Sequence, residues 1–408
     1  MKDELTVEHW ILLAATMVIV GAGSGALFSL GIFLEPIEKA TAWSRTDISA
    51  VALLTWITYG VGSFLWGMLS GRSGVRAVVV IGGFLLGLGL VLSSRATMLW
   101  QFAIAFGGLV GLAVGAFYAP LTTTASNAFK KHRGLAIGLV AAGSGLGTFT
   151  IAPLTRWLIS QYDWRIAMLV LGDLAWLTII PLALIIREKR TAAASVPALG
   201  ARRDREPDLS LFEVARAPQF WLITLTHFTC CLAHSGPIFH MVANATDHRL
   251  APMAAAAVFG VSGLVSIAGR IGSGMMADRL GSKRTLIAML SLQAPAILLY
   301  VFAGGTASFY VIGMVFGLAY GGVMPLYALL TREYFGARAM GGAYGAIFML
   351  QAIGMGLGTF AGGWFYDRLG GYGWLFASAA AVGAAAVILA LALRSPRAVL
   401  HRASPAAA

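Results

Sequence analysis

The stretch Gly274-Met-Met-Ala-Asp278-Arg279-Leu-Gly281 decides the architecture, because it repeats the earlier stretch Gly67-Met-Leu-Ser-Gly-Arg72-Ser-Gly74. Two further pairs follow in the same order, at an offset that stays near roughly 210 residues. One glycine-rich match is weak, but three in order predict two similar halves with a site between them near the membrane midplane. The further pairs are Gly143-Ser-Gly-Leu-Gly-Thr-Phe149 with Gly354-Met-Gly-Leu-Gly-Thr-Phe360, and Leu112-Ala-Val-Gly115 with Leu318-Ala-Tyr-Gly321.

The composition excludes a soluble protein. The chain has 408 residues, of which 58% are hydrophobic and only 11% are charged, whereas soluble domains carry roughly a quarter charged residues. The net charge of +12 does not indicate nucleic-acid binding, because the basic residues lie in short clusters between apolar runs. Cys230 and Cys231 are adjacent in one apolar run, which excludes a disulfide framework. We therefore expect the chain to lie in a lipid bilayer.

The order of apolar runs predicts an all-α membrane protein. A transmembrane helix needs about 20 predominantly apolar residues, and the chain shows six such runs, a polar stretch and six more. We predict a six-helix bundle over 1–187, a cytoplasmic linker over 188–217 with a short amphipathic piece at its end, and a second six-helix bundle with a short cytoplasmic tail over 218–408. The twelve runs lie at about 10–34, 50–70, 77–94, 98–126, 134–160, 165–186, 219–244, 254–277, 285–303, 306–331, 340–366 and 372–393.

The basic residues predict the orientation of the spans. If the N-terminus is cytoplasmic, 21 of the 29 Lys and Arg residues fall in cytoplasmic segments and 7 on the opposite side. Cytoplasmic segments of membrane proteins carry such an excess. We therefore predict a multi-pass protein of the cytoplasmic (inner) membrane with both termini in the cytoplasm. The remaining basic residue, Arg270, lies inside a span.

With its repeated halves, the sequence resembles the major facilitator superfamily over essentially its whole length. The resemblance implies the major facilitator fold and a gating role for the loop that carries the motif. The first-half copy departs from the pattern, since Gly71 stands where an Asp is expected, and this predicts an inner latch that differs between the halves. The loop signature Gly-x-x-x-Asp-Arg-x-Gly-x-Lys/Arg is met by Gly274, Asp278, Arg279, Gly281, Lys283 and Arg284.

A narrower resemblance is to the bacterial monocarboxylate porters and their oxalate/formate-exchanger relatives. The segment Ala128-Phe-Lys-Lys-His-Arg-Gly-Leu-Ala-Ile-Gly138 is similar to the fifth-span signature of this group. Phe220-Trp221 at the start of span 7 and His240-Met-Val-Ala-Asn-Ala-Thr-Asp247 at its end also resemble bacterial members. The resemblance implies secondary active transport of a small organic anion.

Arg270 is the strongest candidate for a substrate-binding residue. It precedes Asp278 by eight residues, so it lies roughly 12 Å from the inner end of span 8, near the midplane. A charge at that depth is rare and usually faces a cavity, and a guanidinium binds a carboxylate through two parallel hydrogen bonds. A structural alternative is an Arg bonded to backbone carbonyls. Ser262, Ser266 and Ser273 share its helix face, and we expect this polar stripe to line a water-filled path.

The other candidates follow from their depth and chemistry. Tyr118, Tyr320 and Tyr327 combine an apolar ring with a hydroxyl, and we expect them to close the pocket, with Gly321-Gly322 and Pro325 breaking span 10. Phe28 and Gln351 are further candidate contacts, at positions where the resemblance implies a basic residue in mammalian-type porters and in oxalate exchangers, respectively. Because neither residue is basic, Arg270 is left as the one deep cation of the sequence. A single positive charge favours a monocarboxylate over a dicarboxylate.

The sequence leaves several candidates for the residue that couples transport to proton movement. In the related mammalian-type porters an Asp precedes the span-8 Arg by one turn, where this chain has Ser266. His234 and His240 are candidates, because imidazole titrates near neutral pH, and Asp173 is the acid placed well inside a span. His227, Cys231 and His234 share a face of span 7, but no carboxylate completes a metal site, and we expect no metal and no other cofactor.

These observations predict a transporter rather than an enzyme, since no nucleophile–base constellation is present. We expect alternating-access transport of a lactate- or pyruvate-like monocarboxylate, coupled to protons or to anion exchange. An oxalate/formate-type antiporter and a drug or metabolite exporter of the same superfamily remain alternatives. The expected partners are the anion, protons and lipid, without nucleic acid, and we expect a monomer.

Overall fold

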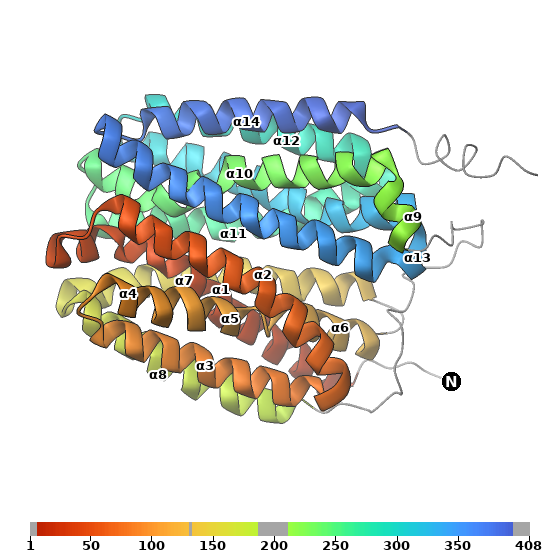
Figure 1. Cartoon of the computed structure of the whole chain (residues 1–408), viewed down its shortest axis with the longest axis horizontal. Helices are drawn as coiled ribbons and strands as arrows, with labels where there is room; N and C mark the ends of the chain where they lie inside the picture. The colour runs from red at the N-terminus through yellow and green to blue at the C-terminus, as the bar shows by residue number, and fades with distance from the viewer. Residues whose placement is uncertain (1–5, 130–132, 187–210, 395–408) are drawn as a thin grey trace, which may run out of the picture.

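Helices account for nearly all of the chain that the computed structural model describes, which is residues 6–129, 133–186 and 211–394. They form two bundles, one from α1 to α8 and one from α10 to α14, which lie side by side with their helices roughly parallel (Figure 1). The predicted fold class is thereby confirmed. The linker between the bundles lies outside the described residues, apart from α9 (Leu211–Arg216), the short helix predicted at its end.

The helix bounds agree closely with the apolar runs. The N-terminal half contains α1 (Val7–Thr41), α2 (Arg45–Ser73), α3 (Val75–Arg95), α4 (Leu99–Phe102), η1 (Ala103–Val110), α5 (Gly111–Val114), α6 (Tyr118–Ala128), α7 (Arg133–Gln161) and α8 (Trp164–Ile185). The C-terminal half contains α10 (Pro218–Asp247), α11 (Pro252–Leu280), α12 (Ser282–Leu299), η2 (Tyr300–Phe302), α13 (Thr306–Leu369) and α14 (Gly373–Ala392). Segments α4 to α6 together form span 4, and α13 contains spans 10 and 11.

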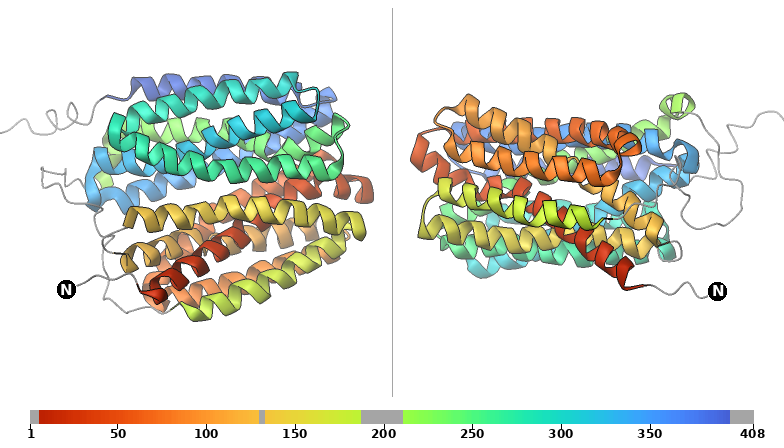
Figure 2. Two further views of the ribbon diagram at one scale, coloured as in Figure 1. Left: turned by 180° about the vertical axis from the view of Figure 1, so that it is seen from behind. Right: turned by 90° about the horizontal axis from the view of Figure 1, so that it is seen from below.

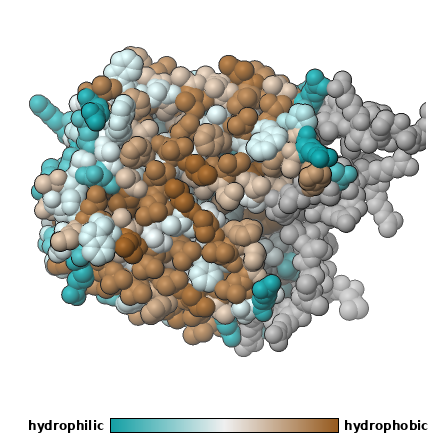
Figure 3. All heavy atoms as spheres, viewed as in Figure 1, coloured by the Kyte–Doolittle hydropathy of each residue, from teal (hydrophilic) through white to brown (hydrophobic). Residues whose placement is uncertain are grey.

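Among the described residues, eleven helical segments are long and apolar enough to cross a membrane. The twelfth predicted span corresponds to α10, whose 30 residues extend about 45 Å but include three histidines that lower its hydropathy. Those side chains are buried between neighbouring helices. Outward-facing side chains such as Phe64, Leu177 and Ile388 are more than 60% exposed. Figure 3 shows the resulting apolar band, with hydrophilic residues gathered towards the two ends. The protein is therefore a multi-pass membrane protein.

The first residue of α1 and the last of α14 lie at the same end of the molecule (Figures 1 and 2). We call this the terminal end and the opposite one the distal end.

A predicted break in span 10 beside Gly321-Gly322 is wrong, since α13 is helical there. Its one non-helical residue is Gly336, with φ 78° and ψ 175°, where span 10 meets span 11 at the terminal end.

The internal repeat reappears in the backbone. Gly74 has φ 87° and ψ 152°, and Gly281 has φ 86° and ψ 149°. Each glycine ends one span and caps the next, so the two motif copies make the same tight connection at the terminal end. Residues with a side chain rarely adopt this conformation, which explains why both copies of the motif end in glycine.

Gly281→Ala is expected to destabilise the protein by about 1–3 kcal/mol, because the alanine Cβ is strained at this positive φ. Steric crowding does not contribute to this destabilisation, since a Cβ at Gly281 meets nothing within 4 Å. Gly274→Ala is the matched control, because Gly274 is helical and its Cβ position is also open. The thermal unfolding midpoint in detergent measures both. Equal midpoints for the two variants would contradict a conformational role for Gly281.

Candidate substrate site between the halves

Arg270 lies in α11 ten residues before the helix ends at Leu280, about 15 Å from that end. Its Nη1 donates a hydrogen bond of 2.6 Å to the carbonyl oxygen of Ala141 in α7. The bond therefore joins the C-terminal half to the N-terminal half. Within the described residues no carboxylate forms an ion pair with Arg270. A cation at mid-depth is thus bound to a neutral acceptor on the facing half.

A tyrosine from each half lies near this guanidinium. Its central carbon lies 6.0 Å from the ring centre of Tyr320, and Tyr118 is close enough to interact electrostatically with it. Tyr59 of α2 and Tyr344 of α13 lie in the neighbourhood of Tyr118. The structure thus brings together three of the residues that we predicted from the sequence, namely Arg270, Tyr118 and Tyr320.

Tyr59 and Tyr344 were missed by the sequence reasoning. A signal for Tyr59 was present, because Trp56 and Tyr59 lie one helical turn apart and the structure packs their rings together at 5.6 Å. Tyr344 had no such signal. Its side chain reaches the site because span 11 lies against α2, where Tyr59 contacts Phe348 at 5.8 Å.

A break in span 4 places Tyr118 at the site. The span is π-helical over Ala103–Val110, turns at residues 115–117 and resumes as a helix at Tyr118. Pro120 explains the break, because it has no N–H to donate to the carbonyl of Ala116 and its ring clashes with that carbonyl in a regular helix. Gly115 fits close to α2 at this point, since a Cβ there would lie 2.6 Å from the backbone nitrogen of Ser63. Such π-helical segments often mark functional sites.

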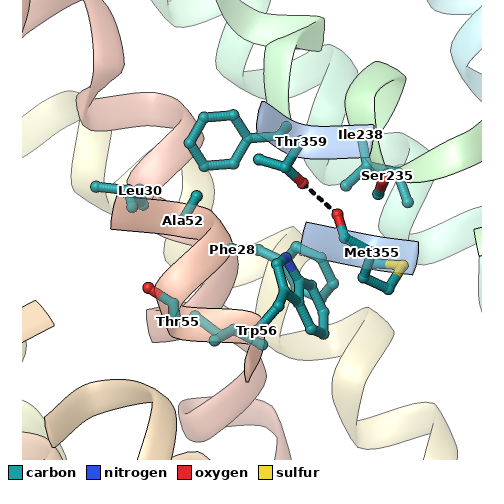
Figure 4. A pocket seen from close by; sticks show the side chains of 11 residues that line it. Phe28, Leu30, Ala52, Thr55, Trp56, Ser235, Ile238, Met355 and Thr359 are labelled. Atoms are coloured by element: carbon teal, nitrogen blue, oxygen red, sulfur yellow. Dashed lines mark hydrogen bonds between the residues drawn. The ribbon is translucent and has the colours of Figure 1, made fainter. Parts of the chain in front are cut away.

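A small aromatic pocket also lies between the halves (Figure 4). Phe28 contacts Trp56 at 5.8 Å and Phe259 of the other half at 6.3 Å. The free volume is about 10 Å³, room for about one water molecule. The Thr359 hydroxyl is bonded to its own helix, at the carbonyl of Met355, while Ser235 Oγ has no hydrogen-bond partner in the structure.

The serine stripe does not line a water-filled path, so that prediction was wrong. Ser262, Ser266 and Ser273 are at most 2% exposed. The backbone of α11 at Ser262 and Ser266 packs directly on Gly317 and Gly321 of α13. Small side chains permit this approach. Spacing along a helix showed that the serines share a face, but it could not show that the face belongs to the interior of the C-terminal half.

Tyr327 and Gln351 lie in a buried polar cluster of the C-terminal half rather than beside Arg270. The Tyr327 ring stacks on His227 at 3.8 Å, and its hydroxyl donates to the Thr226 carbonyl. Gln351 is 3% exposed, and Cys231 is its neighbour. No group of three or more potential metal-ligating side chains is present among the described residues.

The three coupling candidates lie in different surroundings. His234 is fully buried, with Nδ1 3.7 Å from Cys230 Sγ and its ring 5.8 Å from that of Tyr320. His240 is also buried, but it contacts Tyr372 and Thr359 near the distal end. Asp173 lies on the exposed side of α8. His234 is therefore the one of the three that contacts the tyrosine beside Arg270.

The predicted gating motif lies at the terminal end. Asp278 and Arg279 are exposed, and Gly274 and Gly281 meet nothing within 4 Å of an added Cβ. The basic segment Lys130–His132, part of the fifth-span resemblance, lies outside the described residues. The motif therefore lies on the surface of the C-terminal half at the terminal end, and its gating role stays a prediction.

Two similar helical bundles with a mid-depth cation and aromatic side chains between them define a membrane transporter. The family model of the Major Facilitator Superfamily matches residues 12–359, and the chain belongs to this superfamily. A bacterial homologue of the human lysosomal transporter Spinster, solved in an inward-facing and unoccupied conformation, shares the fold with a TM-score of 0.72 at 15% identity, over 99% of this chain and 100% of that one.

The curated relatives carry a narrower name. The chain is 27% identical to monocarboxylate transporter 13 of Bos taurus over 350 residues, which are 85% of this chain and 80% of the relative. It is 28% identical to monocarboxylate transporter 11 of Homo sapiens over 378 residues, which are 89% and 78% of the two chains. Family and relatives indicate a transporter and not an enzyme.

Proposed function

We propose that this transporter carries a small monocarboxylate anion, lactate- or pyruvate-like, by alternating access, with Arg270 binding the carboxylate. The observation that carries the proposal is the position of this guanidinium, at mid-depth between the halves, on a neutral carbonyl. A carboxylate bonded through both oxygens is a stronger partner for Arg than a carbonyl. Substrate binding then replaces the Arg270–Ala141 bond, which frees one contact between the halves as the anion arrives.

The surroundings of Arg270 support a small substrate. Tyr118 and Tyr320 lie near the guanidinium, and their hydroxyls are suited to the keto or hydroxy group of a small acid. The names of the relatives agree with a monocarboxylate. A drug exporter is less favoured, because the charge at mid-depth is that of Arg270 and no carboxylate of the described residues pairs with it.

Two modes of coupling fit the site. His234 provides a titratable ring next to Tyr320, which supports proton symport, whereas a lone cation that alternates between anions supports exchange. Uptake of labelled lactate into proteoliposomes, with and without an inward proton gradient, separates the two. Stimulation by the gradient that is lost in His234→Gln supports symport, and uptake that needs internal anion and ignores the gradient supports exchange.

The transporter is expected to bind lactate or pyruvate at least about ten-fold more tightly than oxalate or succinate. The physical reason is that a second carboxylate would be desolvated in the site without a second cation. Competition against labelled lactate uptake, with a panel of mono- and dicarboxylates at equal concentration, measures the ranking. A dicarboxylate in first place would favour the oxalate/formate-type antiporter instead.

Both termini are expected to be cytoplasmic, in the cytoplasmic membrane. The basic bias of the sequence supports this sidedness, and the two ends of the described chain lie on one side of the molecule (Figure 1). The distal end would then face outward. Reporter fusions at the C-terminus measure the sidedness, with a fusion in the Gly304-Gly305 connection as the opposite control. A C-terminal reporter that is active only outside the cell would reverse the assignment.

A further inference from the structure

Arg45 occupies an enclosed position at the distal end. It is the first residue of α2, where Ser44 and Asp47 cap the helix through reciprocal hydrogen bonds. Although it is charged, Arg45 is only 4% exposed. An Arg in such a place is stable only if its donors are satisfied by well-placed acceptors.

The partners of Arg45 come from both halves. Its Nε donates to Glu38 of α1 at 2.9 Å. Its Nη1 and Nη2 donate to the two carboxylate oxygens of Asp247 in α10 at 2.7 and 3.1 Å, a bidentate pair. Nη1 also donates to the Tyr372 hydroxyl at 2.8 Å, and the guanidinium carbon lies 3.6 Å from the ring centre of Tyr366.

A second bond between the halves lies next to it. The backbone N–H of Thr46 donates to Asp367 of α13 at 2.7 Å. This N–H belongs to the first turn of α2, where the helix dipole favours a negative charge. The helices are in direct contact here, since a Cβ at Gly363 would collide with the carbonyl of Arg45. We call Glu38, Arg45, Asp247, Tyr366, Asp367 and Tyr372 the distal cluster.

His240 holds Tyr372 in place. Its Nε2 is 3.0 Å from the Thr359 carbonyl oxygen, which can only accept, so Nε2 carries the proton. Nδ1, 3.1 Å from the Tyr372 oxygen, then accepts from the hydroxyl. The same oxygen is left to accept from Arg45. His240 is therefore a positioning residue of the distal cluster.

We propose that the distal cluster is a latch between the halves, and that Arg45 must leave Asp247 and Tyr372 before the distal end opens. While it is closed, the Arg45 guanidinium is enclosed by groups of both halves. Separation of the halves exposes these groups to water, which replaces the lost partners. The latch thus favours the closed distal end without making it permanent. The inference goes beyond the proposed function, because it holds for any transported anion.

Spin-label distances in the full chain, purified and reconstituted without substrate, test the latch. One reporter pair, Met98→Cys and Phe302→Cys, marks the two halves at the distal end. Another pair, Ile185→Cys and Leu391→Cys, marks them at the terminal end. All four positions are more than half exposed, whereas Cys230 and Cys231 are buried. The chain without reporters measures any labelling of these two native thiols.

In Arg45→Gln we expect a new population with a longer distance between the distal reporters and a shorter distance between the terminal reporters. This combination indicates that one half has rotated against the other. Arg165→Gln is the matched control. Arg165 lies at the same end, binds the carbonyls of Ser94 and Ala96 and packs on Trp164, all within its own half. We expect its distances to equal those of the parent. His240→Gln can reproduce both hydrogen bonds and should stay closed, whereas His240→Ala should open in part.

Unchanged distances in folded Arg45→Gln would overturn the latch, as would equal shifts in Arg45→Gln and Arg165→Gln. If Arg45→Gln does not fold, Asp247→Asn decides by the same measurement, because it removes the bidentate ion pair and keeps the side-chain shape. Parental distances in Asp247→Asn would then overturn the proposal. No substrate is present in these experiments, so a failed monocarboxylate assay and a failed latch are separate results.

Discussion

Arg270→Gln is expected to reduce the affinity for lactate by roughly 30- to 5000-fold, the equivalent of about 2–5 kcal/mol. Glutamine keeps some hydrogen bonding, but it has no charge, so the desolvated carboxylate of the substrate loses its partner. Arg270→Lys keeps the charge and loses the planar fork. It should retain part of the affinity and discriminate less among acids. Binding is measured by isothermal titration or by a ligand-induced melting shift.

The melting temperature without ligand separates binding from a structural role. Loss of the single Arg270–Ala141 bond, whose donor is charged, removes about 1.5–3 kcal/mol, so both variants should remain folded with a lower midpoint. A purely structural tie predicts a large loss of stability together with normal affinity in the protein that remains folded. Arg165→Gln is again the control, because it loses two bonds to backbone carbonyls far from the site. Normal lactate affinity in Arg270→Gln would end the carboxylate-binding model.

Gly147→Val is expected to prevent stable folding of the N-terminal half, with an effect at or above the upper end of the about 1–3 kcal/mol typical of overpacking. A Cβ at Gly147 would collide with the carbonyl oxygen of Gly21 in α1, and backbone cannot move aside as a side chain can. Gly358 occupies the equivalent place in the C-terminal half, against the carbonyl of Leu232 in α10. Gly358→Val should therefore have a similar effect.

The control for this prediction lies in the same helix. A Cβ at Gly138 meets nothing within 4 Å, so Gly138→Ala should be neutral or stabilise α7 by up to about 1 kcal/mol. Size-exclusion profiles and melting curves of the detergent-solubilised variants measure the outcome. A monodisperse Gly147→Val protein with a parental midpoint would show that α1 and α7 do not need their close contact.

The two glycine-rich runs also have a second face, which the sequence did not reveal. Gly143 and Gly147 pack on α1 within their half, while Gly145 between them faces the other half, where a Cβ would lie 2.5 Å from the Gly263 carbonyl. Gly356 does the same in span 11 against Leu53. The alternating glycines therefore allow close packing within each half and also between the halves, because small residues let helices approach closely.

The sequence by itself determined the elements and their order. Long apolar runs must become helices in lipid, because every backbone polar group must be bonded internally, so the spans and the two repeated halves followed directly. The glycines at 74 and 281 followed from the motif, and the depth of Arg270 followed from counting residues along one helix. Each of these properties depends on residues that are near one another in the chain.

Only the tertiary structure decided which residues of neighbouring helices lie opposite one another. Ala141 is 129 positions from Arg270 and Asp247 is 202 from Arg45, and helical spacing defines a face without naming its neighbour. Packing therefore placed the serines of α11 and Tyr327 inside one half, brought Tyr59 and Tyr344 to the site, and placed His240 beside Tyr372 of the distal cluster. The physical reason is that contacts between helices depend on rotation and tilt, which the packing of all the helices sets together.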